Sequence, residues 1–194
     1  MDIIKGLLNI GAIRVNIDKP FVWTSGIKSP IYCDNRKSLG HYDLRHAIAV
    51  KLAELIKERF PGVEIIGGTA TAGIPHATSV ADILRLPLVY FRSKAKEHGT
   101  TSVIEGDYTK GAKIVIIEDL ISTGGSVLRC AGHARDAGLE VTGVAAIFDY
   151  QLKAGRDNFA DAKIPLEVVT DFADLEKELN LSPEQAEFLA KWRM

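Results

Sequence analysis

The chain has 194 residues, of which 46% are hydrophobic and 25% charged, a composition typical of a globular protein with a single core. Basic and acidic residues are interspersed and nearly balanced, with a formal net charge of -1, so neither nucleic acid nor an anionic membrane is an expected partner. Cys33 and Cys130 lack metal-site or disulfide spacing, and the first residues lack a membrane span or a signal-peptide cleavage site, which together favour a cytoplasmic protein.

Weak periodicity characterises residues 1–42, which we expect to form a helix and then an irregular or β-rich flap over the carboxyl edge of a sheet. An amphipathic helix is predicted over residues 43–60, because apolar residues recur there at helical spacing and Pro61-Gly62 stops the pattern. The residues at that spacing are Leu44, Ile48, Leu52, Leu55 and Ile56.

Strands and helices alternate after this helix. Apolar runs that predict strands occupy residues 63–66, 88–91, 114–117 and 141–148, and helical patterns occupy residues 74–84 and 127–137. Uninterrupted apolar runs indicate strands that are covered on both faces. The sequence therefore predicts a doubly wound α/β fold, in which helices flank both sides of a mainly parallel sheet.

The interval of residues 93–110, between two predicted strands, is long for a simple connection. Loops of this length within a compact domain are often active-site lids, although disorder is an alternative. Basic side chains, among them Lys94, Lys96 and His98, favour the lid. We therefore expect a long mobile loop that closes over a site.

The C-terminal part predicts a short last strand at Val168-Val169 and then helix. Ser182 and Gln185 stand at the spacing of a capping box, and Pro183 suits the first turn of the helix that they begin. No linker separates two independent units, so we expect one domain over residues 1–194. Its expected parts are a helix and base-covering flap (1–42), an α/β core (43–170) and a helical segment (171–194).

Residues 114–126 carry the most chemical information. Their apolar strand ends in Glu118 and Asp119, and ligands bind beyond the carboxyl ends of strands in open α/β sheets, so these acids should face a ligand. Adjacent carboxylates can accept hydrogen bonds from two neighbouring hydroxyl groups. The alternative is that both acids only cap a surface turn.

The small residues after the acids suit a phosphate group. Residues 122–126 offer backbone N–H groups, hydroxyls and the positive end of a helix dipole, and Gly124 and Gly125 permit close approach. A Walker A loop would need a lysine after its second glycine, whereas the near match at residues 68–73 is followed by Ile74. A nucleoside triphosphatase is therefore disfavoured.

Four hydrophobic residues, two acids, two further residues and a Ser-Thr-Gly-Gly-Ser turn make residues 114–126 resemble the phosphoribosyl diphosphate motif of type I phosphoribosyltransferases. Residues 91–99, FRSKAKEHG, resemble the catalytic loop of orotate phosphoribosyltransferases, and residues 24–34, TSGIKSPIYCD, resemble their amino-terminal segment. Residues 68–77, GTATAGIPHA, are similar to the loop that contacts diphosphate in that family. The resemblance implies the type I phosphoribosyltransferase fold with a small N-terminal hood.

This resemblance also implies a reaction. A 5-phosphoribosyl unit would pass from 5-phospho-alpha-D-ribose 1-diphosphate to orotate, giving orotidine 5′-phosphate and diphosphate in pyrimidine synthesis. Mg²⁺ would be the cofactor, held mainly by substrate oxygens and not by a metal site of the protein. The enzyme would be a homodimer whose lid serves the neighbouring subunit, and lid closure would exclude water from the electron-deficient ribose.

The resemblance assigns a role to each candidate residue. Catalytic roles fall to Lys96, His98 and Asp119. The donor would be bound by Arg92, Lys96, His98, Glu118, Asp119, Leu120, Ile121, Ser122, Thr123, Gly124, Gly125 and Ser126. Orotate would be bound by Ser122, Lys28 and Tyr32.

Three positions depart from the family pattern. Ser93 stands where many members have a second basic residue, Ala72 replaces a lysine of some members, and Tyr150 stands where some have an arginine beside the base. The diphosphate is therefore expected to depend more on Arg92 and Lys96. The carboxylate of orotate is expected to depend on backbone N–H groups, on Ser122 and on Lys28, whereas Tyr32 borders the base or packs within the flap.

Two alternatives share the same fold. A purine or uracil phosphoribosyltransferase would keep the donor contacts but would have no base carboxylate to neutralise. A nucleotide-sensing regulator that binds nucleic acid would need a basic face, and the balanced charge counts against it.

Overall fold

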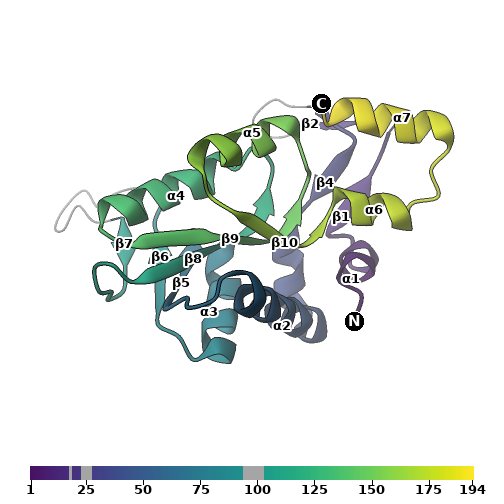
Figure 1. Cartoon of the computed structure of the whole chain (residues 1–194). Helices are drawn as coiled ribbons and strands as arrows, with labels where there is room; N and C mark the ends of the chain where they lie inside the picture. Colours follow the sequence, from purple (N-terminus) through teal and green to yellow (C-terminus); the bar gives the residue numbers. More distant parts are fainter. Residues whose placement is uncertain (18, 23–27, 94–102) are drawn as a thin grey trace.

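A six-stranded sheet forms the centre of the fold (Figure 1). The structure is a computed structural model that describes residues 1–17, 19–22, 28–93 and 103–194. The strands are adjacent in the order β10-β9-β8-β5-β6-β7, and neighbours are parallel except β6 and β7. Their bounds are β5 (Ile65–Thr69), β6 (Leu88–Phe91), β7 (Ile104–Glu105), β8 (Lys113–Ile121), β9 (Glu140–Asp149) and β10 (Leu166–Asp171). This order confirms the mainly parallel sheet that the apolar runs predict.

Helices cover both faces of this sheet (Figure 1). One face is covered by α2 and α3, and the other by α4 and α5. The four helices span Tyr42–Arg59 (α2), Gly73–Leu84 (α3), Gly125–Asp136 (α4) and Lys153–Ala162 (α5). The doubly wound arrangement is therefore confirmed.

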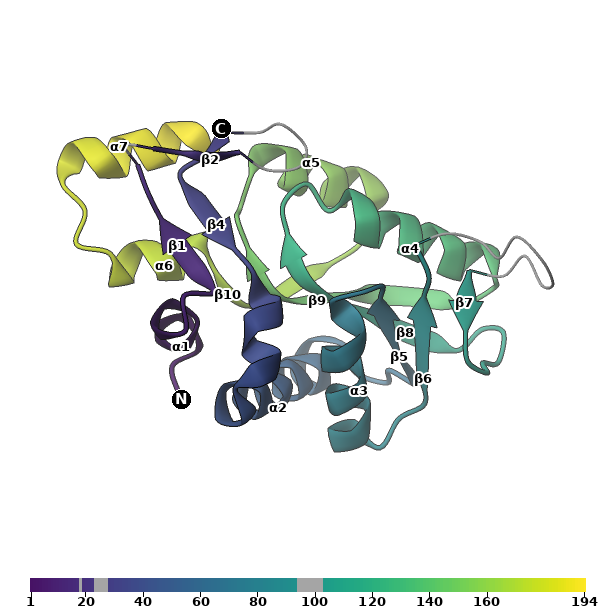
Figure 2. The same ribbon diagram turned by 180° about the vertical axis from the view of Figure 1, so that it is seen from behind.

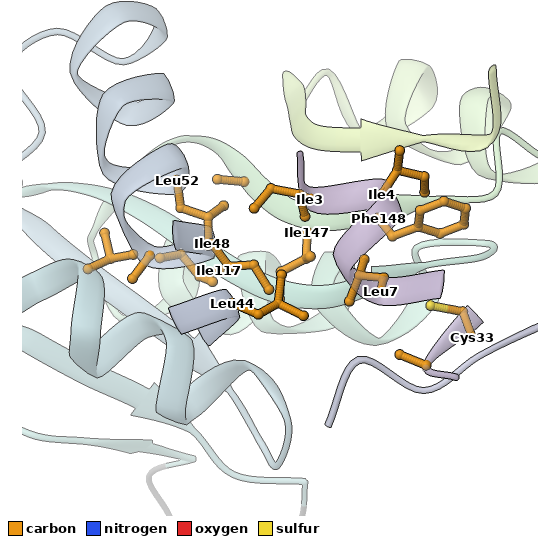
Figure 3. Close-up of a cluster of buried hydrophobic side chains, with 14 of the residues drawn as sticks. Ile3, Ile4, Leu7, Cys33, Leu44, Ile48, Leu52, Ile117, Ile147 and Phe148 are labelled. Atoms are coloured by element: carbon orange, nitrogen blue, oxygen red, sulfur yellow. The ribbon is translucent and has the colours of Figure 1, made fainter. Parts of the chain in front are cut away.

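Alternating side chains on β8 divide the core into two clusters. Val115 and Ile117 pack in the cluster that includes α2, α3 and the N-terminal helix α1 (Ile3–Asn9). Ile114 and Ile116 pack in the second cluster, with α4 and α5. Figure 3 shows part of the first cluster, where side chains of α1 and α2 meet those of β8 and β9. Both faces of the central strand are buried, which explains its continuous apolar run.

A small β-rich unit, which we call the hood (residues 13–40), stands at one end of the sheet (Figure 2). In it, β1 pairs antiparallel with β4, β2 pairs antiparallel with β3, and the 3-10 helix η1 follows β4. The bounds are β1 (Ile13–Val15), β2 (Phe21–Val22), β3 (Lys28–Ser29), β4 (Ile31–Cys33) and η1 (Asn35–Gly40). The N-terminal flap expected from the sequence therefore consists of two short antiparallel pairs in its described residues.

The C-terminal helices α6 (Phe172–Glu178) and α7 (Pro183–Trp192) lie on the side of the hood (Figure 2). As predicted, Ser182 and Gln185 form a capping box at the start of α7. At the other end of α7, the indole N–H of Trp192 donates to the backbone carbonyl of Lys28 at 3.1 Å. This bond attaches the C-terminus to the hood. None of the helices in the described ranges is long and apolar enough to cross a membrane.

Three elements differ from the expectation. Strand β8 continues past the two acids, because its parallel pairing with β9 extends to Ile121. Helix α5 was not predicted, since Phe159 is the only large apolar side chain among its buried residues. Within the interval expected to be a loop, β7 pairs with β6, whereas residues 94–102 of the expected lid lie outside the described residues.

Candidate active site

The two acids of the motif lie near the carboxyl end of β8. Glu118 is 7% exposed, and its carboxylate accepts hydrogen bonds from Ser126 Oγ at 3.2 Å and from the backbone N–H of Asp119 at 3.1 Å. Because side chains alternate along a strand, Glu118 faces α4 and Asp119 faces the hood. There, burial and then the charge of Asp119 raise the pKa of the Cys33 thiol. The acids therefore border the strand end from two sides.

Asp119 is electrostatically unusual. Burial, followed by the charge of Glu118, raises the pKa of Asp119 to about 7, and Arg36 of the hood opposes this rise. A carboxyl group in this state exchanges its proton near neutral pH. A cationic ligand beside it would favour the ionised form, so the site is suited to a group that develops positive charge.

The turn that joins β8 to α4 has the form of an anion site. Gly124 has a φ of 74°, and a Cβ there would lie 2.5 Å from Cε2 of Phe159, so glycine is required on both counts. The first N–H groups of α4 have no carbonyl within the helix to bond, and they carry the positive end of its dipole. The predicted phosphate turn, residues 122–126, therefore presents donors toward the carboxyl edge of the sheet.

Helix α5 supports this turn from behind. Asn158 Nδ2 donates to the backbone carbonyl of Thr123 at 2.9 Å. A Cβ on Gly155 would lie 2.6 Å from the backbone carbonyl oxygen of Ser122, so α5 packs directly on the turn. These contacts were not predicted, because α5 itself was not predicted.

The loop between β5 and α3 lies against β8. The hydroxyl of Thr69 donates to the backbone carbonyl of Ile117 at 3.2 Å. A Cβ on Gly73 would lie 2.5 Å from that same carbonyl oxygen, which leaves no room for a larger residue. The loop predicted to contact diphosphate, including Ala72, therefore reaches the edge of the sheet next to the acid pair.

Basic side chains gather beside the turn. Arg92 follows β6, and its Nη1 lies 3.5 Å from Oε1 of Glu105. It lines a cavity of about 100 Å³ together with Arg129 and His133 of α4. Arg129 Nη1 lies 3.7 Å from the point where a Cβ on Gly125 would sit.

Sequence reasoning selected Arg92 and missed the other two basic residues of this cavity. Gly125, Arg129 and His133 follow one another at intervals of four residues, so they share one face of α4. Helical side chains lean toward the N-terminus of their helix, which brings the guanidinium back to the phosphate turn. This spacing was the signal that could have identified them.

The candidate base-binding residues lie on the hood. The Tyr32 ring is half-buried, 5.7 Å from the Phe21 ring between centroids, and the guanidinium of Arg14 lies 4.9 Å from the centroid of Tyr32. Lys28 is exposed. Tyr150, at the position of the family's arginine, is only 2% exposed, and its hydroxyl accepts the backbone N–H of Cys33 at 2.9 Å. Tyr150 therefore holds the hood and does not line an open base site.

The remaining candidates are placed differently. Leu120 and Ile121 belong to β8. Because the side chain of Ile121 is buried in the core, it cannot contact a bound phosphoribosyl donor. Lys96 and His98 lie outside the described residues. In the described ranges, no group of three or more histidine, cysteine, aspartate or glutamate residues could hold a metal ion.

A doubly wound sheet, an acid pair near the end of its central strand and a glycine-containing phosphate turn together define a phosphoribosyltransferase. Consistent with this class, the family model for the phosphoribosyl transferase domain matches residues 41–176.

Curated relatives narrow the class further. The orotate phosphoribosyltransferase of Enterococcus faecalis is 57% identical over 173 residues, covering 89% of this chain and 82% of the relative. That of Bacillus cytotoxicus is 48% identical over 196 residues, covering 99% and 93%. The chain therefore belongs to the orotate phosphoribosyltransferase family.

Solved structures agree with this membership. A crystal structure of orotate phosphoribosyltransferase from Aeropyrum pernix has a TM-score of 0.79 and 30% sequence identity, covering 91% of this chain and 98% of that one. The enzyme of Mycobacterium tuberculosis, solved in complex with 5-phospho-alpha-D-ribosyl 1-diphosphate, has a TM-score of 0.61 and 26% identity, covering 74% and 82%.

Proposed function

We propose that this protein transfers the 5-phosphoribosyl group of 5-phospho-alpha-D-ribose 1-diphosphate to orotate, giving orotidine 5′-phosphate and diphosphate. The observation that carries the proposal is the meeting of a buried acid pair and a phosphate turn at the end of β8, in a chain of this family. The donor complex of the Mycobacterium tuberculosis relative supports the choice of donor.

The reaction places opposite charges at two ends of the donor. As the bond from ribose C1 to the diphosphate breaks and the bond from C1 to orotate forms, positive charge develops on the sugar and negative charge moves to the leaving group. We assign Glu118 and Asp119 to the ribose hydroxyls and the cationic ring, and residues 122–126 to the 5′-phosphate. The hydrogen bonds of Glu118 orient its carboxylate before substrate arrives, which is the preorganisation that lowers a barrier.

The leaving diphosphate needs positive charge. We assign Arg92 to it, together with Lys96 and His98 of the lid and the backbone of the loop between β5 and α3. Arg129, close to Gly125, adds positive charge beside the 5′-phosphate turn. On the base side, we assign orotate to Tyr32, Lys28 and Ser122.

Mg²⁺ is the cofactor that this chemistry requires. Mg²⁺ is usually bound through one or two carboxylates together with substrate phosphates and water. Glu118 and Asp119 are assigned to the ribose, and no group of three or more possible ligand residues in the described ranges could hold the ion, so we assign its ligands mainly to donor oxygens. When bound, the ion would offset the negative charge of the diphosphate.

We further propose a homodimer whose lid completes the neighbouring site. This proposal rests on the resemblance to orotate phosphoribosyltransferases, in which the lid serves the neighbouring subunit. Mixing the impaired Lys96→Ala protein with the impaired Asp119→Asn protein should raise the activity above that of either variant alone, because a mixed dimer has one site with both residues intact. A mixture no more active than its two components would rule out the shared lid.

The proposed reaction is tested by following orotate consumption with the ribosyl donor, with and without Mg²⁺. We expect turnover of orotate that is lost when Mg²⁺ is chelated. Adenine, hypoxanthine and uracil serve as competing substrates in parallel assays. Diphosphate release with one of these bases and none with orotate would overturn the proposal.

A further inference from the structure

Asn35 is a buried side chain at the junction between the hood and the sheet. It is 0% exposed, and its Nδ2 donates to the backbone carbonyl of Asp119 at 2.6 Å. Its Oδ1 accepts from Sγ of Cys33, the last residue of β4, at 3.2 Å. One amide therefore joins the strand that carries Tyr32 to the residue assigned to the ribose.

The first turn of η1 does not depend on the amide of Asn35. The first turn of η1 is closed by Ser38, whose hydroxyl donates to the backbone carbonyl of Asn35 at 2.6 Å. The amide of Asn35 instead reaches β8, 84 positions further along the chain. Burial of an amide is costly unless both of its ends are bonded, so an apolar residue would serve packing alone at least as well.

A second bond ties the same strand to the sheet. The backbone N–H of Cys33 donates to the hydroxyl of Tyr150, which follows β9. Tyr32 therefore lies next to a residue that is fixed to the ends of both β8 and β9. The hood and the acid pair are held at one separation by two hydrogen bonds whose partners are far apart in the sequence.

We propose that Asn35 is a positioning residue that fixes the base-covering hood to the backbone of Asp119, so that base and ribose phosphate are bound as one ligand. The inference rests on the proposed function, because it assigns the hood to the base and Asp119 to the ribose. Two subsites held in fixed geometry bind a linked ligand more tightly than their separate affinities suggest, and a loose connection loses that gain.

The test compares a nucleotide with its two halves. Calorimetry would give the Kd of orotidine 5′-phosphate, of ribose 5-phosphate and of orotate for the wild type and for Asn35→Ala. We expect the variant to bind orotidine 5′-phosphate about tenfold more weakly, as loss of one buried hydrogen bond of about 1.4 kcal/mol would give. Both halves should bind within about twofold of their wild-type affinity, because each subsite is intact.

Asn158→Ala is the matched control. Asn158 also donates its amide to a backbone carbonyl of the site, that of Thr123, but it holds the phosphate turn and not the hood. Loss of this bond should lower the affinities for ribose 5-phosphate and for orotidine 5′-phosphate by the same factor. Asn35→Ala should instead lower only the affinity for orotidine 5′-phosphate.

Tyr150→Phe provides a second variant should Asn35→Ala fail to fold. It removes the hydrogen bond between the Cys33 backbone N–H and the Tyr150 hydroxyl with little change in shape. It should therefore also lower the affinity for orotidine 5′-phosphate and leave the affinities for the two halves unchanged. The inference is overturned if the folded variants bind ribose 5-phosphate and orotidine 5′-phosphate more weakly by the same factor. It is also overturned if the affinities for all three ligands are unchanged. A wild-type protein that binds neither nucleotide nor ribose 5-phosphate would instead reject the proposed function itself.

Discussion

Asp119 combines a raised pKa with a position between the phosphate turn and the hood. Its neighbour Glu118 is tied by hydrogen bonds to Ser126 and to the Asp119 backbone, so the pair cannot separate to relieve repulsion. Burial, and then the charge of Glu118, makes Asp119 prefer its neutral form. Positive charge that develops on the ribose during the reaction would favour the ionised form instead.

The pH dependence of the reaction follows from this residue. Ionised Asp119 stabilises positive charge on the ribose. We therefore expect kcat/KM for the phosphoribosyl donor to fall as the pH drops below about 7, which is the pKa of Asp119 in the free protein. Asp119→Asn should lower kcat/KM by about 100-fold and remove this decrease. Steady-state rates between pH 5.5 and 9, roughly one unit or more on either side of that pKa, would measure both profiles. The phosphates of the donor titrate in both proteins, and an unchanged profile in the variant would exclude Asp119 as the group responsible.

Which site residues a sequence can identify depends on how local their partners are. Glu118 and Asp119 were identifiable because they adjoin a turn of small residues in the same stretch of chain. Asn35 was not, since its partner lies 84 positions away and no local pattern marks a buried amide. Tyr150 was recognised only as a departure from the family pattern, and its bond to Cys33 gives that departure a physical reason.

Among the elements, α5 shows how a helix can matter to a site without touching a ligand. Phe159 is the only large apolar side chain among its buried residues, so no repeat of large apolar residues predicted it, whereas α2, α3 and α4 were predicted from such repeats. The hood strands were equally difficult, because each of them is only two or three residues long. Long, buried elements of the sheet and its helices were predictable, and the short elements that complete the site were not.

A glycine pair tests the role of α5. Gly155→Ala places a methyl group 2.6 Å from the Ser122 carbonyl oxygen, so α5 must move away from the phosphate turn. We expect weaker binding of ribose 5-phosphate, by about tenfold, and a loss of about 1–3 kcal/mol in the free energy of unfolding. Calorimetric binding and urea denaturation would measure the two effects.

Gly132→Ala is the control for this change. Gly132 lies on α4, and a Cβ there meets nothing within 4 Å, so alanine should stabilise the helix by about 0.5–1 kcal/mol and leave binding unchanged. Equal binding of ribose 5-phosphate by the two alanine variants would show that α5 does not set the geometry of the turn.

At the scale of the whole molecule, the two ends of the chain meet at the hood. The N-terminal strands carry the candidate base residues, and the last turn of α7 holds them through the bond from Trp192 to Lys28. The Trp192 ring also packs edge-on against Tyr150, with 6.0 Å between centroids. The alternation of strands and helices predicted the sheet, but contacts between the two ends of a chain leave no periodic pattern. The hood's attachment was therefore visible only in three dimensions.

His76, in the helical layer formed by α2 and α3, should make the free energy of unfolding decrease at acid pH. His76 of α3 is 1% exposed, and neither ring nitrogen has a hydrogen-bond partner among the described residues. Burial, aided by the positive charge of Arg45 on α2, lowers the pKa of His76 to about 4. In the unfolded chain, imidazole takes up its proton near pH 6.5, so protons bind the unfolded state first. Stability conferred by neutral His76 is therefore complete above about pH 6.5 and is lost as the pH falls toward 4.

His76→Leu tests this assignment, because leucine fills similar space without a proton to bind. The variant should match or exceed the wild-type free energy of unfolding at pH 7.5, and its advantage should grow by about 2–3 kcal/mol between pH 6.5 and pH 4. Asp119 acts in the opposite direction over part of this range, since its raised pKa favours the folded state as the pH falls from about 7 toward 4. Urea denaturation of wild type and variant at matched pH cancels that contribution, because both proteins retain Asp119. A difference that stays constant from pH 7.5 to pH 4.5 would mean that His76 is protonated as readily in the folded protein as in the unfolded chain, and that water reaches it.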